Sequence, residues 1–374
     1  MADGDARYGR GDEQGERGQV RGERGDGRDG SYGRGGVRSA VRSAVLTAVA
    51  GWVPGEPVRN EALPAAWDVD DAWVRKRTGI GSRHRAGAGV STGDLAYEAA
   101  RRLIGRPAGP LHERPDAVVL ATATPDHPCP ATAPALAARL GLGQVPAFDI
   151  GAVCSGFVYG LAVCHGLIVS GLYDRILLVG ADVYSTLLDP MDRSTGVVFG
   201  DGAGAALIGA GRPGDPGELL AFDLGSDGTE HGLVAVDGGG ARARSLPGPE
   251  GEWDPYFRMR GRTVYQHAVE RMTGSCRSLL RTVDWEADEV DHFVPHQANG
   301  RILRSVADRL GIDAARCVVH LDRVGNTGAA SIPLALADAA ADKRFRAGDR
   351  MLLTAFGGGL TWGTAALRWP GPAS

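Results

Sequence analysis

Three short runs, far apart in the chain, carry side chains that could take part in nucleophilic catalysis. One holds a thiol (Cys154), one an imidazole (His296) and one an amide (Asn326), each among small residues that would leave it accessible. The runs are DIGAVCSG at 149–156, PHQAN at 295–299 and VGNTG at 324–328. A cysteine and a histidine form a candidate nucleophile and partner, but alone they are a weak indication. The interpretation depends on the elements that position them.

Cys154 is the candidate nucleophile. It follows a strand-like segment at 147–150 and precedes an apolar, helix-like run at 157–172. We therefore expect the sulfur at a helix N-terminus, where free N–H groups and the helix dipole lower the pKa of a thiol. The alternative is that a cysteine is only a small buried hydrophobe. That alternative suits three other cysteines: Cys164, Cys276 and Cys317.

His296 and Asn326 are the candidate partners of this thiol. His296 directly follows the strand-like segment at 293–295, and parallel α/β folds place their sites at the carboxyl ends of strands. His296 could instead be a structural histidine in a loop. Asn326 precedes a helix-like segment and could simply be its N-cap. An internal repeat that pairs Asn326 with Cys154 favours a catalytic role for the asparagine.

The repeat consists of two copies of one βαβ unit. The stretch 116–141 runs from an apolar strand through a polar loop into a helix that ends at a Leu-Gly pair, and 291–311 does the same. Each copy continues with a β segment, a tight turn into a helix, and a closing strand that begins with Asp-Arg. Strands and helices that alternate in this way predict parallel βαβ units. A pseudo-twofold axis between the copies would bring Cys154 and Asn326 together at equivalent helix starts.

With further motifs in the same order, these runs resemble the β-ketoacyl-acyl-carrier-protein synthase III family, a branch of the thiolase-fold condensing enzymes. The further runs are WVRKRTGI at 73–80, DRST at 192–195, FGDGAG at 199–204, FGGG at 356–359 and TWG at 361–363. The resemblance covers about Val37 to the C-terminus. It implies an α/β, thiolase-like fold in which two pseudo-twofold-related βαβ halves form a layered αβαβα core. We expect these halves to span 37–210, with the cysteine, and 211–374, with the histidine and asparagine.

The resemblance also implies a two-step reaction. Cys154 takes an acyl group from an acyl-CoA, and the acyl enzyme then condenses with malonyl-acyl-carrier protein as carbon dioxide leaves. His296 and Asn326 donate hydrogen bonds to the malonyl thioester carbonyl. The backbone N–H groups of Cys154 and Gly358 form the oxyanion hole that such a reaction needs. The reaction implies no metal and no redox cofactor.

Five further positions match the family's tunnel for CoA or pantetheine. Trp73 and Arg193 match the pair that stacks the CoA adenine, and Arg77 matches a residue near the CoA phosphates, contacts that suit an arginine chemically. Trp73 could instead belong to the core. Gly261 and Tyr265 match tunnel-lining positions, and Tyr265 replaces the more usual phenylalanine.

Other positions suggest macromolecular partners. Arg301 and Arg304 follow the histidine motif and could contact the acidic acyl carrier protein. In the family, a loop crosses the homodimer interface and contributes a bulky residue, commonly phenylalanine, to the partner's acyl pocket. Cys129 stands at that position here, so we expect a homodimer with a wider or longer acyl pocket than acetyl needs. His127 and Cys129 lack further ligands at suitable spacing for a metal site.

Composition limits the remaining classes of function. The 374 residues fit two fused units of about 150 residues each. A net charge of −4 gives no global attraction to nucleic acid. The five cysteines show no CxxC pairing and suggest reduced thiols in a cytoplasmic protein. No apolar run approaches the ~20 residues that span a bilayer, and the N-terminus lacks the apolar segment of a signal peptide.

The first 36 residues differ from the rest. Glycine and arginine dominate, and seven arginines face eight acidic residues, so residues 1–36 are nearly neutral. A segment with so few apolar residues cannot offset its ordering entropy and should be disordered. RNA binding by its Arg-Gly steps is disfavoured, because the acidic residues cancel the positive field that phosphate binding requires.

Two alternatives to condensation remain open. One is an acyltransferase that passes the acyl group from Cys154 to an alcohol, an amine or a carrier thiol. Relatives that have abandoned condensation often change the histidine or asparagine, and both are present here. The other is a non-catalytic partner subunit of a synthase, against which the intact cysteine argues.

Overall fold

Two mixed β-sheets form the framework of the computed structural model, which describes residues 41–104, 114–245 and 253–371. The tail expected at 1–36 lies outside the described residues. The first sheet has the order β1 (Ser43–Trp52), β7 (Gly202–Gly211), β6 (Arg175–Asp182), β4 (Ala117–Ala121), β5 (Ala147–Ile150). The second has the order β11 (His292–Pro295), β12 (Arg350–Gly357), β13 (Thr361–Arg368), β8 (Leu219–Ser226). Two short ribbons pair β2 (Val58–Arg59) with β3 (Ser82–Arg83) and β9 (Val234–Val236) with β10 (Phe257–Met259).

The two sheets repeat one pairing pattern. In the first, β4 pairs in parallel with β5 and β6, β6 pairs antiparallel with β7, and β7 antiparallel with β1. In the second, β11 pairs in parallel with β12, β12 antiparallel with β13, and β13 antiparallel with β8. A parallel bridge between Phe293 and Cys317 stands where β5 stands in the first sheet. The repeat expected from the sequence is therefore present, while the boundaries 37–210 and 211–374 stay predictions.

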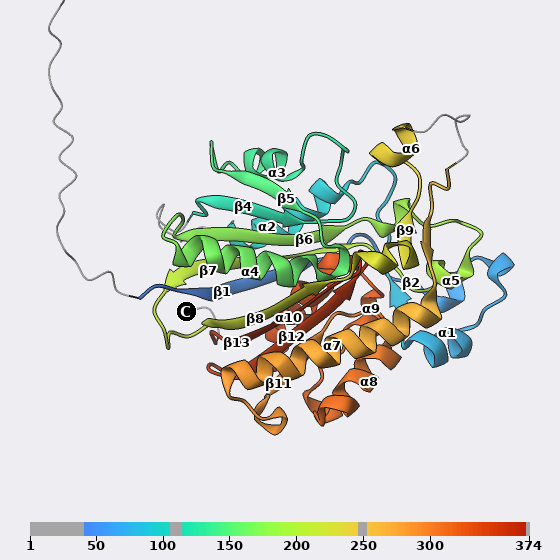
Figure 1. Ribbon diagram of the computed structural model, residues 1–374. Helices are drawn as coiled ribbons and strands as arrows, with labels where there is room; N and C mark the ends of the chain where they lie inside the picture. The colour runs from blue at the N-terminus through green and yellow to red at the C-terminus, as the bar shows by residue number, and fades with distance from the viewer. Residues whose placement is uncertain (1–40, 105–113, 246–252, 372–374) are drawn as a thin grey trace, which may run out of the picture. The chain divides into compact units, whose positions relative to one another are not determined.

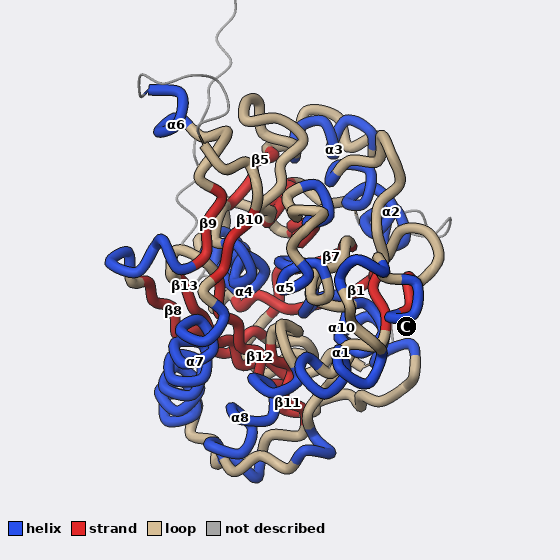
Figure 2. Tube along the Cα trace, turned by 90° about the vertical axis from the view of Figure 1, so that its right-hand side faces the viewer, coloured by secondary structure: helices blue, strands red, loops and turns tan. Residues whose placement is uncertain are grey.

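Helices form three layers around these sheets (Figures 1 and 2). The helices are α1 (Asp71–Thr78), α2 (Thr92–Ile104), α3 (Ala133–Arg139), α4 (Gly156–Val169), α5 (Arg193–Gly196), α6 (Ala241–Ser245), α7 (Gly261–Val283), α8 (Gly300–Leu310), α9 (Leu321–Val324) and α10 (Ser331–Ala341). α2 and α3 cover the outer face of the first sheet, and α7 and α8 cover that of the second. α4 and α10 contact both sheets and form the middle layer. This is the predicted αβαβα arrangement of a thiolase-type fold.

The sequence explains why the central elements are buried. β4 reads AVVLA, with every residue buried, as expected of a parallel strand covered on both faces. α4 reads GFVYGLAVCHGLIV and is apolar nearly all round, as expected of a helix enclosed between two layers. Short 3₁₀ turns, Val153–Ser155 and Gly328–Ala330, lead into α4 and α10 and contact each other. The two helix starts that carry the candidate thiol and amide thus meet in the middle of the fold.

In the part of the chain that is described, no helix combines the length and the apolar character that crossing a bilayer would require.

Candidate active site

A cavity of about 770 Å³ lies where the two middle helices begin. The predicted site residues that line it are Cys154, His296, Asn326, Gly358, Trp73, Arg77, Gly261, Tyr265 and Arg301. Arg193, Arg304 and Cys129 do not line it. The fold thus brings residues from both halves of the chain to one cavity.

Cys154 lies in a strained turn at the entrance to α4. The 3₁₀ turn Val153–Ser155 precedes the first residue of α4, Gly156, so the sulfur is close to a helix N-terminus, as expected. Val153 has a φ of 46°, a left-handed conformation that is unfavourable for a β-branched residue. Strain of this kind persists where the surroundings fix the backbone, and here it presents the thiol to the cavity.

The last residue of β12, Gly357, packs directly against this turn. A Cβ atom on Gly357 would lie 2.9 Å from the backbone nitrogen of Cys154 and 3.0 Å from the carbonyl oxygen of Ala152. Both neighbours are backbone atoms that cannot rotate away, so only glycine allows this approach. Gly358, the predicted second donor of the oxyanion hole, follows immediately and lines the same cavity.

Our expectation of a lowered thiol pKa is wrong for the free protein. Burial raises the pKa of Cys154 to about 12, and the charge of Asp182 adds to the increase, while a hydrogen bond with Tyr184 opposes it. The thiol of Cys154 is therefore neutral in the free protein near pH 7. Cys154 is half-buried and lines the cavity.

His296 stands at the carboxyl end of β11, as predicted, and is 3% exposed. Its Nδ1 lies 2.6 Å from the hydroxyl oxygen of Ser331 on α10. The backbone N–H of Gln297 also donates to that hydroxyl oxygen, at 3.4 Å. In the tautomer in which the serine hydroxyl donates to Nδ1, the ring proton stands on Nε2, the nitrogen left for a ligand. Burial lowers the pKa of His296 to about 3, which keeps the ring neutral.

Asn326 is held so that its amide can act as a donor. Its Oδ1 accepts a hydrogen bond of 3.0 Å from the backbone N–H of Gly328, which fixes the orientation of the amide and leaves Nδ2 for the cavity. Its backbone N–H donates to Val198, and its carbonyl accepts from Gly200. The side chain contacts the turn that leads into α10, so the N-cap alternative has a structural basis as well.

The other polar residues of the PHQAN run hold the loop, a role that sequence reasoning missed. Both side-chain groups of the fully buried Gln297 are used: the amide donates to Pro295 and Val318, and Oε1 accepts from His320 and Leu321. Such complete pairing is expected of a buried amide.

Asn299 connects two elements that line the cavity. Its Oδ1 accepts from the N–H of Arg301 and caps α8, and its Nδ2 donates to the carbonyl of Arg77 on α1. An asparagine directly before a helical run is a signal of an N-cap that the sequence offered.

Asp182 is a buried carboxylate between the two halves. It accepts hydrogen bonds from the backbone N–H groups of Ala123 and Ala329 at 2.7 and 2.8 Å, and from the hydroxyls of Thr122 and Thr124. It therefore ties the end of β6 to the turn that follows Asn326. Burial raises its pKa to about 7, because these hydrogen bonds offset the desolvation only in part.

This titration predicts a pH dependence of stability. An aspartate in an unfolded chain titrates near ~3.9, so the folded protein binds this proton more tightly. The resulting stabilisation of the folded state is fully present below about pH 4 and is lost as the pH rises through about 7. At ~1.4 kcal/mol per pKa unit, this stabilisation amounts to about 4 kcal/mol at most. Asp182→Asn cannot titrate. The difference in free energy of unfolding, wild type minus Asp182→Asn, should therefore fall between about pH 4 and pH 8 in urea titrations. A difference that stays constant with pH would contradict the assignment.

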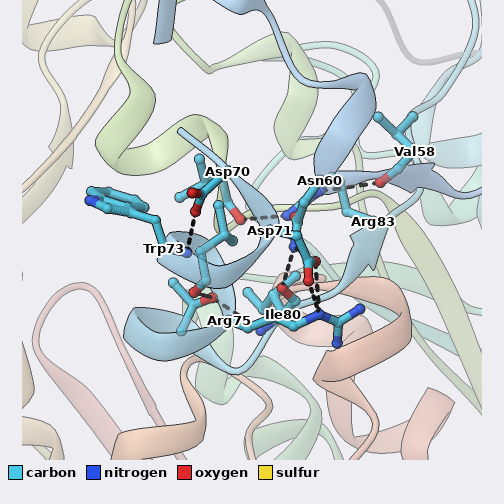
Figure 3. A network of polar contacts seen from close by, with 11 residues as sticks. Val58, Asn60, Asp70, Asp71, Trp73, Arg75, Ile80 and Arg83 are labelled. Carbon is cyan, nitrogen blue, oxygen red and sulfur yellow. Dashed lines mark hydrogen bonds and ion pairs between the residues drawn. The ribbon is translucent and has the colours of Figure 1, made fainter. Parts of the chain in front are cut away.

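Trp73 lines the cavity from a well-fixed helix. Asp70 caps α1 by accepting a hydrogen bond of 2.6 Å from the N–H of Trp73, and Asn60 donates to Asp71 at 2.8 Å and to Ile80 at 2.9 Å. The indole points away from this network (Figure 3). Trp73 is half-buried, packs against the core and lines the cavity, so the core alternative has a structural basis, while the contact with a nucleotide stays a prediction.

Two guanidinium groups lie over the Trp73 ring. Arg77 is 4.0 Å and Arg193 is 5.4 Å from the ring centroid. Arg193 does not line the cavity, but its side chain donates to the carbonyl of Trp67 at 2.8 Å and so stays beside Trp73. The predicted adenine-stacking pair is therefore adjacent in the structure. An adenine between them would need about 7 Å, two aromatic contact distances, so Arg193 would have to move outward.

The remaining predicted residues lie on α7, on α8 and in a surface loop. Tyr265 lies 2.7 Å, hydroxyl to hydroxyl, from Ser305 and thus links the two helices. Arg301 is exposed and donates to the carbonyl of Lys76 at 2.9 Å. Arg304 is exposed on the same helix. Cys129 is exposed in a loop away from this chain's cavity.

Comparison with known proteins gives consistent matches. Two models of the family described as 3-oxoacyl-[acyl-carrier-protein (ACP)] synthase III match residues 148–228 and, for its C-terminal part, 280–369. Beta-ketoacyl-[acyl-carrier-protein] synthase III 5 of Streptomyces coelicolor is 54% identical over 88% of this chain and 98% of the relative.

Solved structures agree with the sequence matches. The 3-oxoacyl-(acyl carrier protein) synthase III of Pseudomonas aeruginosa PAO1 has a TM-score of 0.82 and 49% identity over 88% of this chain and 98% of its own. The priming β-ketosynthase of the R1128 polyketide biosynthetic pathway has a TM-score of 0.81 and 29% identity over 90% and 99%. The resemblance expected from the motifs is confirmed. The chain belongs to the β-ketoacyl-acyl-carrier-protein synthase III family of thiolase-fold acyltransferases.

Proposed function

We propose that this protein catalyses the decarboxylative condensation of an acyl-CoA with malonyl-acyl-carrier protein, and so primes fatty-acid or polyketide synthesis. The observation that carries the proposal is the convergence of Cys154, His296 and Asn326 on one cavity that Trp73 and Arg77 also line. A non-catalytic subunit would have no need of a strained, cavity-facing thiol together with two oriented donors.

The first half-reaction transfers the acyl group to sulfur. Cys154 attacks the thioester carbonyl of the acyl-CoA, the bond to the CoA sulfur breaks, and the thiol proton ends on CoA. The backbone nitrogen of Cys154 and that of Gly358 are the proposed donors to the oxyanion. The close approach of the end of β12, directly before Gly358, to the turn that carries Cys154 supports this pair, since preorganised backbone donors cost no rearrangement when charge develops.

The second half-reaction forms the carbon–carbon bond. The malonyl thioester carbonyl accepts hydrogen bonds from Nε2–H of His296 and from Nδ2 of Asn326, which stabilise the enolate formed as carbon dioxide leaves. The enolate carbon attacks the acyl carbonyl, and the Cys154 thiolate departs and takes up a proton. A histidine with a pKa of about 3 suits the role of neutral donor, because it keeps its Nε2 proton at every working pH. The chemistry involves no change of oxidation state and requires no redox cofactor or metal.

The substrates are proposed to enter past the guanidinium groups at the mouth. Trp73, Arg77 and Arg193 offer stacking and positive charge for the CoA nucleotide, and Gly261 and Tyr265 line the path of the pantetheine arm. Arg301 and Arg304 offer an exposed basic surface on α8 for the acidic carrier protein.

A homodimer is proposed from two unpartnered surfaces of the described chain. β5 is an edge strand, with one side free for pairing. The end of α4 exposes apolar residues, Val169 at 40% and, just beyond the helix, Leu172 at 62%. In such a dimer the exposed loop with Cys129 would reach the partner's acyl pocket and leave it wider than a phenylalanine would.

The substrates and the unpaired thiols suit a cytoplasmic enzyme.

The test is product analysis with a panel of acyl-CoAs of increasing length and branching, each with malonyl-acyl-carrier protein. We expect a β-ketoacyl-carrier thioester two carbons longer than the starter, with one carbon dioxide released per product. Because Cys129 replaces a bulky residue, starters longer than acetyl should be used at least as well as acetyl. Transfer of the acyl group to another acceptor without loss of carbon dioxide would instead establish a simple acyltransferase. The absence of turnover with every donor would indicate a non-catalytic partner subunit.

A further inference from the structure

The nucleophile has a neighbour that no sequence motif indicates. The hydroxyl of Tyr184 lies 3.9 Å from Sγ of Cys154, and among the described residues it is the one side chain within hydrogen-bonding range of that sulfur. Tyr184 is 1% exposed and begins the 3₁₀ turn Tyr184–Thr186 that follows β6. A buried phenol normally finds a strong acceptor, but the contact found here is with sulfur, a weak acceptor while it is a neutral thiol.

The phenol cannot turn away from the sulfur. Its ring stacks on Phe199 with 4.7 Å between centroids and meets Phe257 edge-on at 5.7 Å. On another side it faces Gly328, where an added Cβ would lie 2.4 Å from Cε2 of the tyrosine. Aromatic packing on these sides fixes the ring and therefore the position of its hydroxyl.

The charged and titratable groups that act on the sulfur explain why this contact matters. Asp182 lies at the end of β6, and its negative charge opposes formation of a thiolate. His296 lines the same cavity and is neutral, so it supplies no positive charge. The N-terminus of α4 is the remaining favourable influence from the secondary structure. Burial and Asp182 raise the pKa of the thiol, and the Tyr184 hydroxyl acts in the opposite direction.

We propose that Tyr184 is a catalytic residue whose phenol donates a hydrogen bond to the sulfur of Cys154 and stabilises it as a thiolate. The inference rests on the proposed function for its place in the reaction, but not for the contact itself. Negative charge develops on this sulfur twice: when the thiol loses its proton during acyl transfer, and when the thiolate leaves the tetrahedral intermediate during condensation. The phenol keeps its own proton in both steps, because burial raises the pKa of Tyr184 well above its usual value.

The first test needs no substrate. The rate of alkylation of Cys154 by iodoacetamide, followed by intact-protein mass spectrometry across a range of pH, reports the fraction of thiolate. In Tyr184→Phe the apparent pKa should rise by about one unit, which lowers the alkylation rate at a fixed pH about tenfold. Tyr159→Phe is the matched control, because it removes a hydroxyl from α4 that donates to the carbonyl of Gly225 at 2.8 Å instead. An unchanged profile in Tyr184→Phe, or an equal shift in Tyr159→Phe, would overturn the proposal.

A second measurement covers the case in which Tyr184→Phe packs poorly. Replacement of all tyrosines by 3-fluorotyrosine makes each phenol a stronger donor, so the apparent pKa of Cys154 should fall. The same labelling of Tyr184→Phe should produce no fall. A fall of equal size in both proteins would place the effect at another tyrosine and refute the assignment.

The half-reactions then separate this inference from the proposed function. Tyr184→Phe should slow acylation and condensation by similar factors, each on the order of tenfold. If alkylation shifts as expected but no acyl-CoA charges the wild-type protein, the proposed function fails and the contact with the nucleophile stands. If charging and condensation proceed unchanged in Tyr184→Phe, the role of Tyr184 fails and the proposed function stands.

Discussion

Cys154→Ala should yield a folded protein that forms no acyl enzyme with any acyl-CoA. Alanine fits the site, since the sulfur faces the cavity and the strained backbone at Val153 is held by its own surroundings. Without the sulfur there is no atom to carry the acyl group, and loss of a nucleophile typically costs ~10⁴-fold or more in turnover. Intact-protein mass spectrometry after incubation with acyl-CoA checks this directly.

The matched control for this variant is another cysteine. Cys164 lies ten residues further along the chain, within α4, is fully buried and packs in the apolar cluster between the sheets. Cys164→Ala should keep the mass gain on acylation and lose only a little stability. A mass gain that persists in Cys154→Ala, or one that disappears in Cys164→Ala, would contradict the assignment of the nucleophile.

His296→Ala should separate the two halves of the reaction. The imidazole is assigned to the malonyl carbonyl and not to the thiol, so charging of Cys154 should remain within a few-fold of the wild-type rate. Condensation should fall by about 10²- to 10³-fold, the cost of removing one preorganised donor to a developing oxyanion. Single-turnover mixing of the preformed acyl enzyme with malonyl-acyl-carrier protein measures the second step alone.

The pH dependence of that second step gives a further check on the histidine. Because burial lowers the pKa of His296 to about 3, the wild-type condensation rate should carry no inflection from this residue near its ordinary value of ~6.5. The control is His292→Ala, at the opposite end of the same strand, where the ring lies 2.9 Å from Asp349. His292→Ala should preserve both half-reactions. Equal loss of both half-reactions in His296→Ala would assign the histidine to the thiol instead.

The arrangement of the candidate catalytic groups was predictable because it follows from topology. Two copies of a βαβ unit place equivalent turns at equivalent helix starts, and the pairing of the strands in both sheets reproduces that repeat. Cys154 and Asn326 could therefore be placed together although 172 positions separate them. His296 could be placed by the rule that sites lie at the carboxyl ends of parallel strands.

The electrostatics of the site could not be predicted in the same way. A helix N-terminus is visible in the sequence, and it led to the expectation of a lowered thiol pKa. The burial of the sulfur and the charge of Asp182 depend on elements that meet only in the folded chain, and their combined effect is the larger one. Tyr184 could not be predicted from the sequence for a similar reason, since its position beside the thiol depends on its packing against Phe199 and Phe257.

The most direct test of the central claim follows the mass of the intact protein through both half-reactions in one sample. Incubation with an acyl-CoA should add the mass of the acyl group to Cys154. Addition of malonyl-acyl-carrier protein labelled at the free carboxyl carbon should then restore the original mass, release labelled carbon dioxide and give a β-ketoacyl-carrier thioester. A mass that is restored without labelled carbon dioxide, or that never increases with any acyl-CoA, would contradict the account.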